Sequence, residues 1–333
     1  MVEHTGRATV LLTDRAWPDE TVERTVLATA GFTLVSGPSD PAPAPVIESL
    51  VADHQPDAIL TCWAPVSAAA IAASCPLRVV ARMGVGLDNI DVDAATTSGV
   101  LVTNVPDYCV EEVSDHAVAL VLAWTRGIAQ ADRQVRAGRW DPASARLRRL
   151  STLTCGVVGF GRIGRSTARK LLALGARVLA STPHPPADSG GVPVVALEEL
   201  LARSDVVIVH APLTAATHHL LGARELSLMP PGSLLVNVSR GGLVDTAALV
   251  GALACGHLSG AGLDVLEGEP AVPPELLEHP GVVITPHIAF SSDASVLDLR
   301  RSAAEEVVRV LTGQTPHYAC NDPQDVATRG GCR

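Results

Sequence analysis

Three polar side chains stand in a pattern that could perform acid–base chemistry on an oxygen atom. Arg240, Glu269 and His287 each lie in a polar segment that follows an apolar run typical of a buried strand. Ligands bind at the carboxyl ends of strands in an open α/β sheet. There a guanidinium could anchor a carboxylate, an imidazole could donate a proton, and a carboxylate could pair with that imidazole and favour its protonated form. The segments are Asn237–Asp245, Gly262–Pro270 and Thr285–Phe290.

A glycine-rich turn at residues 159–164, with the sequence Gly-Phe-Gly-Arg-Ile-Gly, lies between an apolar strand and the start of a helix. Gly159 would permit the tight turn, Gly161 would let the backbone approach a pyrophosphate, and Gly164 would allow close packing of helix and strand. The helix N-terminus adds N–H donors and partial positive charge. This context predicts a dinucleotide site, the alternative being a turn that serves packing alone. Each polar side chain could singly be an ordinary loop residue, but their combination with this motif favours a catalytic set.

The strand that should follow this helix ends in Ala180-Ser181-Thr182-Pro183-His184. In dinucleotide-binding sheets an acid here, about 20 residues beyond the glycine motif, binds the ribose hydroxyls of NAD. Thr182 supplies no carboxylate, and no arginine or lysine follows before Arg203. The sequence therefore leaves NAD and NADP both open, with NAD slightly favoured.

Apolar, β-branched runs alternate with alanine-rich helical stretches, which favours parallel βαβ units with right-handed crossovers. One group of strands precedes residue 104, and a second group, sufficient for a dinucleotide-type sheet, follows an apolar helix at Glu111–Thr125. A last helix, from Ile288 to about Gly313, would return to the first sheet, and the tail after Cys320 should be an arm. We therefore predict an α/β protein with two doubly wound parallel-sheet domains and a ligand cleft between them. The expected strands are Thr9–Leu12, Thr33–Ser36, Ala58–Thr61, Arg78–Arg82, Val100–Thr103, Thr154–Val158, Arg177–Ala180, Val206–Val209, Leu234–Asn237, Ala261–Asp264 and Val282–Thr285.

The composition is that of an ordinary globular protein: of 333 residues, 47% are hydrophobic and 18% are charged. The formal charge of −10, from 25 basic and 35 acidic side chains, argues against nucleic acid or an anionic membrane as partner. The 7 cysteines form no Cys-x-x-Cys pair, so neither a disulfide framework nor a metal site is expected. The N-terminus lacks a secretory pattern, and the longest apolar run is far below the ~20 residues of a membrane span. These features predict a cytoplasmic protein.

The polar segments and the glycine turn resemble those of the D-2-hydroxyacid dehydrogenase family, which includes phosphoglycerate dehydrogenase and the glyoxylate and hydroxypyruvate reductases. The match covers about residues 80 to 322, whereas the earlier residues match in pattern only. The resemblance implies a flavodoxin-like substrate domain formed by residues 1–104 and 287–333, and a Rossmann domain formed by residues 105–286. It also implies NAD(P)-dependent hydride transfer at C2 of a D-2-hydroxy or 2-keto acid. The other matching motifs are Arg82–Asp91, Asn104–Pro106, Val113–Ala117 and His210–Thr214.

The resemblance also implies a role for each polar side chain. Arg240 would bind the substrate carboxylate and polarise the keto oxygen, while His287 would be the general acid in reduction and the general base in oxidation. Glu269 would pair with His287, and Glu267, two residues earlier, is the less favoured partner. The substrate-binding residues implied in the first domain are Val85 and Gly86, through their backbone N–H groups, and Trp63.

A further set of residues is implied around the dinucleotide. Gly161, Arg162 and Ile163 would contact the pyrophosphate, and Asp264 would lie against the nicotinamide carboxamide. The remaining cofactor-binding residues implied by the resemblance are Gly159, Gly164, Thr182, His210, Ala211, Pro212, Thr217 and Val238.

Two departures from the family pattern narrow the substrate. Members that act on 3-phosphoglycerate have an arginine in the loop that is Thr61–Pro65 here, and formate dehydrogenases have a glutamine where this chain has Glu269. Both substrates are therefore disfavoured, while the side chain of the 2-keto acid stays open. The alternative function is a dinucleotide-sensing binding protein of the corepressor type, which would need long extra segments that the sequence does not show.

The helix at Val110–Thr125 is apolar over a wide arc. Because the family that the chain resembles forms dimers through the equivalent region, this arc predicts a homodimer with a two-fold axis. The alternative is a helix buried inside one subunit.

Overall fold

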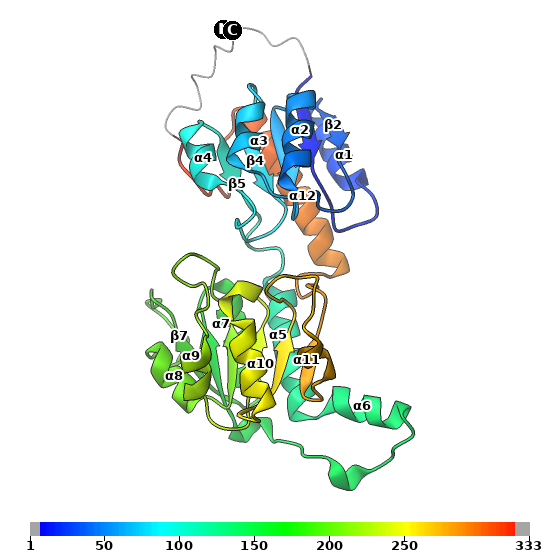
Figure 1. Ribbon diagram of the computed structural model, residues 1–333. Helices are drawn as coiled ribbons and strands as arrows, with labels where there is room; N and C mark the ends of the chain where they lie inside the picture. Colours follow the sequence, from blue (N-terminus) through cyan, green and yellow to red (C-terminus); the bar gives the residue numbers. More distant parts are fainter. Residues whose placement is uncertain (1–6, 324–333) are drawn as a thin grey trace. The chain divides into compact units, whose positions relative to one another are not determined.

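The computed structural model of the protein describes residues 7–323 and divides into two compact units (Figure 1). The first unit holds the residues up to Tyr108 and those from Ser292 onward, and the second holds Cys109–Ser291. Residues 105–108 thus belong to the first unit, and residues 287–291 belong to the second. The part of the expected C-terminal arm beyond residue 323 lies outside the described residues. No helix within residues 7–323 is long and apolar enough to cross a membrane.

The first unit contains a parallel sheet in the order β2-β1-β3-β4-β5, which is the flavodoxin-like order. Strands β3 (Ala58–Thr61) and β4 (Val79–Arg82) are buried along their whole length, as expected of a parallel sheet with helices on both faces. The N–H of Cys320 donates to the carbonyl oxygen of Val102 at 2.8 Å, so the start of the tail is tied to the sheet edge. The other strands are β1 (Thr9–Leu12), β2 (Thr33–Ser36) and β5 (Leu101–Thr103).

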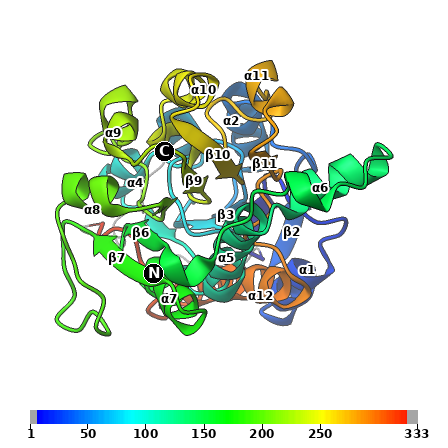
Figure 2. The same ribbon diagram turned by 90° about the horizontal axis from the view of Figure 1, so that it is seen from below.

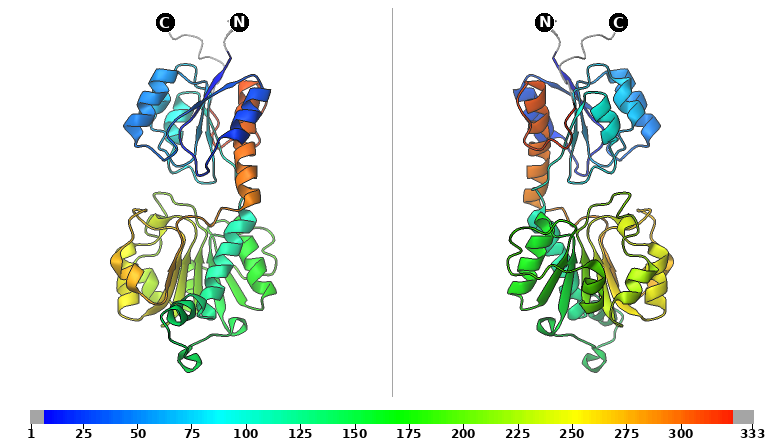
Figure 3. Two further views of the ribbon diagram at one scale, coloured as in Figure 1. Left: turned by 90° about the vertical axis from the view of Figure 1, so that its right-hand side faces the viewer. Right: turned by 90° about the vertical axis from the view of Figure 1, so that its left-hand side faces the viewer.

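Helices α1 and α12 cover one face of this sheet, and α2, α3 and α4 cover the other (Figure 3). The guanidinium of Arg300 on α12 binds the carboxylate of Glu23 on α1 through two hydrogen bonds of 2.9 and 2.8 Å. Both side chains are buried, so this pair joins the two helices beneath the surface. The helices are α1 (Thr21–Thr29), α2 (Ala44–His54), α3 (Ala68–Ala73), α4 (Val92–Thr97) and α12 (Asp293–Leu311).

The last helix begins later than the sequence pattern predicts, at Asp293 and not at Ile288. The backbone N–H groups of Ile288 and Ala289 donate to the carboxylate of Asp264, each at 2.9 Å, and are therefore held outside any helix. The hydroxyl of Ser292 then accepts from the N–H of Ser295 and caps the helix.

The second unit contains a parallel sheet in the order β11-β10-β9-β8-β6-β7. An isolated parallel bridge between Ala180 and Val194 extends the sheet beyond β7. With this bridge counted as a strand, the sheet follows the Rossmann order 3-2-1-4-5-6, with β11 added at the far edge. The order reverses between β6 and β8, which is where such sheets bind ligands. The strands are β6 (Thr154–Val158), β7 (Arg177–Ser181), β8 (Val206–Val209), β9 (Ser233–Asn237), β10 (Leu258–Leu263) and β11 (Val282–Ile284).

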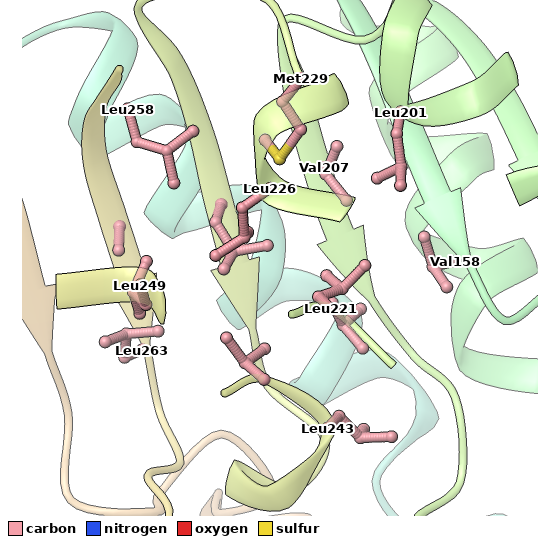
Figure 4. Close-up of a cluster of buried hydrophobic side chains, with 14 of the residues drawn as sticks. Val158, Leu201, Val207, Leu221, Leu226, Met229, Leu243, Leu249, Leu258 and Leu263 are labelled. Carbon is pink, nitrogen blue, oxygen red and sulfur yellow. The ribbon is translucent and has the colours of Figure 1, made fainter. Parts of the chain in front are cut away.

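All of the strands expected from the sequence are present, and the largest difference is at β10, which begins at Leu258 and not at Ala261. On one face of the second sheet, leucines such as Leu201, Leu226 and Leu249 pack with the strands into a buried core (Figure 4). They come from α8 (Leu197–Arg203), α9 (Ala223–Leu228) and α10 (Thr246–Ala254), and α11 (Pro274–Glu278) adds to the same core. Short 3-10 helices lie at Pro142–Ser144, Leu150–Thr152 and Gly241–Leu243.

The other face of the second sheet is covered by α5 (Val110–Thr125) and α7 (Arg162–Ala173). The apolar side chains of α5, including Val113, Ala117 and Val121, are buried within their own unit. The apolar side chains of α5 therefore do not form a free surface. They were the reason for expecting a subunit interface at this helix, and that reason is corrected by their burial. A further helix, α6 (Ile128–Arg136), extends away from the rest of the unit and has no buried residue (Figure 2).

Candidate active site

The glycine turn after β6 is shaped by close backbone packing. Gly159 has φ +92°, and a Cβ there would lie 2.5 Å from the carbonyl carbon of His210. A Cβ at Gly164 would overlap the carbonyl oxygen of Gly159, so two of the three glycines are required by the chain itself. At Gly161, by contrast, a Cβ would meet no atom within 4 Å. Gly161 is exposed at the N-terminus of α7, where open space beside N–H donors fits a pyrophosphate.

The segment after β8 packs against the glycine turn. The imidazole Nε2 of His210 lies 2.9 Å from the hydroxyl oxygen of Thr167 on α7, and burial lowers the pKa of His210 to about 3, so the ring is neutral. Its Nδ1 is buried without a hydrogen-bond partner among the described residues. The predicted contact of His210 with a cofactor stays a prediction. Farther along, the hydroxyl of Thr217 donates to the carbonyl oxygen of Pro212 at 2.6 Å and closes a compact turn.

The end of β7 carries no acid, as the sequence indicates, and arginines line a groove beside the loop that follows it. Thr182 is half-buried, and its hydroxyl oxygen accepts from the N–H of His184 at 3.4 Å. A groove of about 600 Å³ lies between α7 and the loop that follows β7. Arg162 and Arg165 of α7 line it together with Asp188. Reading along the loop alone misses these arginines, because they come from the preceding helix.

Arg240 follows β9, in a segment that backbone packing holds in place. The side-chain amide of Asn237 donates to the carbonyl oxygen of Arg240 at 2.9 Å, and the hydroxyl of Ser239 donates to the carbonyl oxygen of Val209 at 2.8 Å. At Gly241 a Cβ would overlap the backbone of Leu266, so this position admits only glycine. The guanidinium of Arg240 is thus presented from a fixed backbone, at the carboxyl end of the strand that pairs with β10.

His287 and Glu269 lie against each other at the ends of the next two strands. The imidazole Nδ1 of His287 is 3.0 Å from Oε1 of Glu269, and the two side chains are 24% and 39% exposed. His287 has φ +55°, a strained value for a residue with a Cβ, and the carbonyl oxygen of Asp264 holds it by accepting from its N–H at 2.8 Å. Glu267, the less favoured partner, binds His219 and not His287.

The carboxylate of Asp264 organises the turn that carries His287. Its Oδ1 accepts from the hydroxyl of Thr285 at 2.6 Å and from the N–H of Ile288, and its Oδ2 accepts from the N–H of Ala289. The imidazole Nε2 of His116 on α5 lies 2.9 Å from the hydroxyl oxygen of Thr285. Sequence reasoning assigned no role to His116 or Thr285, although both stand in segments that carry the family resemblance. The observed contacts make Asp264 a positioning residue for the turn.

The predicted substrate residues of the first unit also cluster at strand ends. Trp63 follows β3 and Val85 and Gly86 follow β4, and these two strands are paired. The carboxylate of Asp14 accepts from the N–H of Trp63 at 2.6 Å and from its two neighbours in the chain. The side-chain amide of Asn104 donates to the carbonyl oxygen of Val85 at 2.7 Å. Arg240, Glu269 and His287 belong to the second unit, so the structure places the predicted residues in two sets.

Replacing Glu269 with glutamine is expected to lower kcat for reduction by about tenfold. Glutamine can still accept a hydrogen bond from Nδ1 of His287, but the bond loses its charge, and charge-assisted bonds are about twice as strong as neutral ones. Glu269→Ala should lower kcat further, because the ring also loses its orientation. Steady-state kinetics of both variants test this, with Glu267→Gln as the matched control. Equal effects of Glu267→Gln and Glu269→Gln would contradict the pairing.

Comparison with known proteins agrees with this geometry. Residues 118–289 match the family described as D-isomer specific 2-hydroxyacid dehydrogenase, NAD binding domain. The chain is 42% identical over 276 residues to the D-3-phosphoglycerate dehydrogenase of Mycobacterium leprae (strain TN), an alignment that covers 82% of this chain and 52% of that protein. The chain thus spans about half the length of this relative.

Two solved structures share the fold over nearly the whole chain. One is the NADPH-dependent glyoxylate/hydroxypyruvate reductase from Sinorhizobium meliloti, in complex with NADP and malonate, with TM-score 0.84, 33% identity, and coverage of 94% of this chain and 97% of that one. The other is the D-lactate dehydrogenase from Aquifex aeolicus, complexed with NAD and lactic acid, with TM-score 0.85, 29% identity, and coverage of 95% and 100%. Because the family match spans more than half of the sequence and includes the glycine turn and the segments of Arg240, Glu269 and His287, the chain belongs to the D-isomer specific 2-hydroxyacid dehydrogenase family of enzymes.

Proposed function

We propose that the protein is an NAD(P)-dependent oxidoreductase that transfers a hydride between the nicotinamide and C2 of a D-2-hydroxy or 2-keto acid. The observation that carries this proposal is the pair formed by His287 and Glu269 at 3.0 Å, on the same sheet edge as Arg240. A bound nicotinamide cofactor supplies or accepts the hydride. The protein's part is to bind, orient and exchange a proton.

Reduction of a keto carbon leaves negative charge on its oxygen, so a cation and a proton donor must converge there. The guanidinium of Arg240 binds the substrate carboxylate and polarises the keto group. His287, oriented through Nδ1 by Glu269, delivers a proton to the oxygen from Nε2 and takes it back in oxidation. Trp63, Val85 and Gly86 of the first unit are proposed to contribute to recognition of the substrate.

The second unit supplies groups that fit a dinucleotide. The open position at Gly161 and the N-terminus of α7 suit the pyrophosphate, next to Arg162 and Ile163. Asp264 is proposed to contact the carboxamide in addition to holding the turn of His287. The remaining proposed contacts are Gly159, Gly164, Thr182, His210, Ala211, Pro212, Thr217 and Val238.

The experiment that tests the proposed function is an assay of the purified protein against a panel of 2-keto acids, with NADH and NADPH in parallel. The panel includes glyoxylate, hydroxypyruvate and pyruvate for reduction, and D-3-phosphoglycerate is tested for oxidation with NAD⁺ and NADP⁺. We expect oxidation of NADH or NADPH that depends on one or more of the keto acids and gives the D-hydroxy acid wherever C2 of the product is a stereocentre. Tight binding of dinucleotide without turnover of any substrate would instead favour a sensing protein.

The values of kcat/KM for NADH and NADPH are expected to lie within about two decades of each other, or roughly 3 kcal/mol at ~1.4 kcal/mol per decade. The hydroxyl of Thr182 neither binds both ribose hydroxyls nor repels a phosphate, so neither cofactor is strongly selected. Thr182→Asp should shift the ratio toward NADH, as parallel initial-rate measurements would show. Discrimination beyond about a thousandfold in the native enzyme would mean that other groups, first among them Arg162 and Arg165, set the choice.

We also propose that the protein forms a homodimer, with the segment around α6 in its interface. Ile128, Val135 and Trp140 are 57%, 49% and 85% exposed, and apolar side chains so close along one segment are typical of an interaction surface. Light scattering at micromolar concentration should give the mass of a dimer, and Trp140→Glu should shift it toward the monomer. Leu174→Glu, a change at an exposed leucine at the end of α7, should leave the dimer intact. A monomer mass for the native protein would reject the proposal.

A further inference from the structure

Two histidines and a glutamate meet in the second unit, apart from the pair of His287 and Glu269. His218 and His219 lie between β8 and α9, and Glu267 lies in the segment after β10. Nε2 of His219 is 2.8 Å from Oε1 of Glu267, and Nε2 of His218 is 3.8 Å from the same oxygen. One ligand atom from each of the three side chains lies within 4.8 Å of the others.

The backbone brings the two consecutive imidazoles to the same side. His219 has φ +52°, a left-handed value that is uncommon for a residue with a Cβ. The rings stack with their centroids 4.0 Å apart and an angle of 28° between their planes. Neighbouring residues do not ordinarily point the same way, and strained backbone of this kind is concentrated at binding sites.

Main-chain hydrogen bonds keep this arrangement in place. The N–H of His219 donates to the carbonyl oxygen of Gly242 at 2.8 Å, and the N–H of Leu221 donates to the carbonyl oxygen of Leu243 at 3.0 Å. Hydrogen bonds from His219 and Thr246 hold the carboxylate of Glu267 in place. The three side chains are thus presented from a supported backbone.

We propose that His218, His219 and Glu267 bind one divalent transition-metal ion of the Zn²⁺ class. Zn²⁺ is a borderline-soft ion that imidazole nitrogens and carboxylate oxygens both bind. It takes three protein ligands with a fourth position for water. Ligand atoms at the corners of a tetrahedron with bonds of ~2.1 Å are ~3.4 Å apart, and the distances of 2.8 and 3.8 Å lie on either side of that value. His218 is 55% exposed, which gives the ion access from solvent.

No metal site was expected from the sequence, but that expectation considered only the spacing of the cysteines. The site proposed here has histidine and glutamate ligands. It is also independent of the proposed function, because none of its three ligands is in the proposed catalytic set.

The test uses the full chain without an affinity tag, with Cys255→Ser to remove an exposed thiol that could bind metal elsewhere. Co²⁺ is titrated and followed by its visible absorption, and Zn²⁺ binding is followed by calorimetry. We expect one ion per chain, tetrahedral Co²⁺ bands and a Tm that rises with Zn²⁺. Loss of an outer-shell partner costs about 10- to 100-fold in metal affinity, so His218→Ala, which removes a direct ligand, should weaken binding by at least about 100-fold.

One control and one further variant complete the test. His54→Ala removes an exposed histidine of the first unit and should leave binding unchanged. Glu267→Gln should weaken binding as His218→Ala does, because it removes the anionic ligand. The proposal is overturned if the native chain binds neither ion with a stoichiometry near one, or if His218→Ala binds as the native chain does, in which case the cluster is an ordinary ion pair between His219 and Glu267.

Discussion

Replacing His287 with alanine is expected to lower kcat by about 10²- to 10⁴-fold, the range that a general acid–base group contributes. The imidazole stands 3.0 Å from Glu269 on a turn that Asp264 holds at a strained φ of +55°. Such a costly backbone conformation is maintained here by four hydrogen bonds to one aspartate, two from neighbouring N–H groups, one from a hydroxyl and one from His287 itself to the carbonyl. Alanine removes the proton donor and leaves this scaffold in place.

Stopped-flow and steady-state kinetics with the best keto acid of the panel provide the measurement, and fluorescence titration of dinucleotide provides the control. Cofactor affinity should change little, because the ring acts on the substrate oxygen. His54→Ala, a loss of an exposed histidine in the first unit, should keep the native kcat. If His287→Ala turned over substrate at the native rate, this residue would have no place in the mechanism.

Replacing Arg240 with lysine is expected to lower kcat/KM by about 100-fold, with a lower kcat and a higher KM. Lysine keeps the charge but lacks the planar fork that engages a carboxylate through two hydrogen bonds. Losing one hydrogen bond to a charged group costs about 1.5–3 kcal/mol, or roughly 10- to 150-fold. The backbone that presents Arg240 is held by Asn237 and by the packing of Gly241, so the substitution should not disturb the fold.

The division of the effect between kcat and KM tests the two jobs proposed for Arg240. Loss of ground-state anchoring raises KM, whereas loss of carbonyl polarisation lowers kcat. A variant in which only KM rises would retain the anchoring role and remove the polarising one. Binding of a dicarboxylate inhibitor gives a second test of the anchoring role, because the inhibitor should bind the native enzyme and lose affinity for the variant.

The elements of the fold were predictable because each strand is a short apolar run between helical stretches. β3 and β4, for example, are apolar nearly throughout, as strands covered on both faces must be. The bridge at Val194 was missed because a single pair of residues leaves no periodic pattern. The start of α12 was misplaced because Asp264, remote in sequence, takes the N–H groups of Ile288 and Ala289.

The candidate site was predictable only where its residues lie in motifs. Residues that meet only because different helices, strands and loops pack together could not be recognised from sequence motifs. The arginines of α7 reach the loop after β7 through the packing of helix on strand, and His218 and His219 meet Glu267 through a left-handed turn. The position of the His210 ring depends on a contact with Thr167 of a neighbouring helix. Spacing along a chain does not encode such contacts.

The pairing of α12 with α1 has a consequence for the order in which the protein is made. The second unit is one continuous stretch, Cys109–Ser291, and its sheet can form as soon as that stretch leaves the ribosome. The first sheet must wait with one face covered by α1 alone. At about 5–20 residues per second, the wait lasts on the order of ten seconds or more, until Leu299, Ala303 and Val307 of α12 arrive to complete the cover. During this interval the nascent chain exposes an apolar surface of the kind that chaperones bind. Arg300 then neutralises Glu23 as the two side chains become buried, so the first domain to be synthesised is the last to be completed.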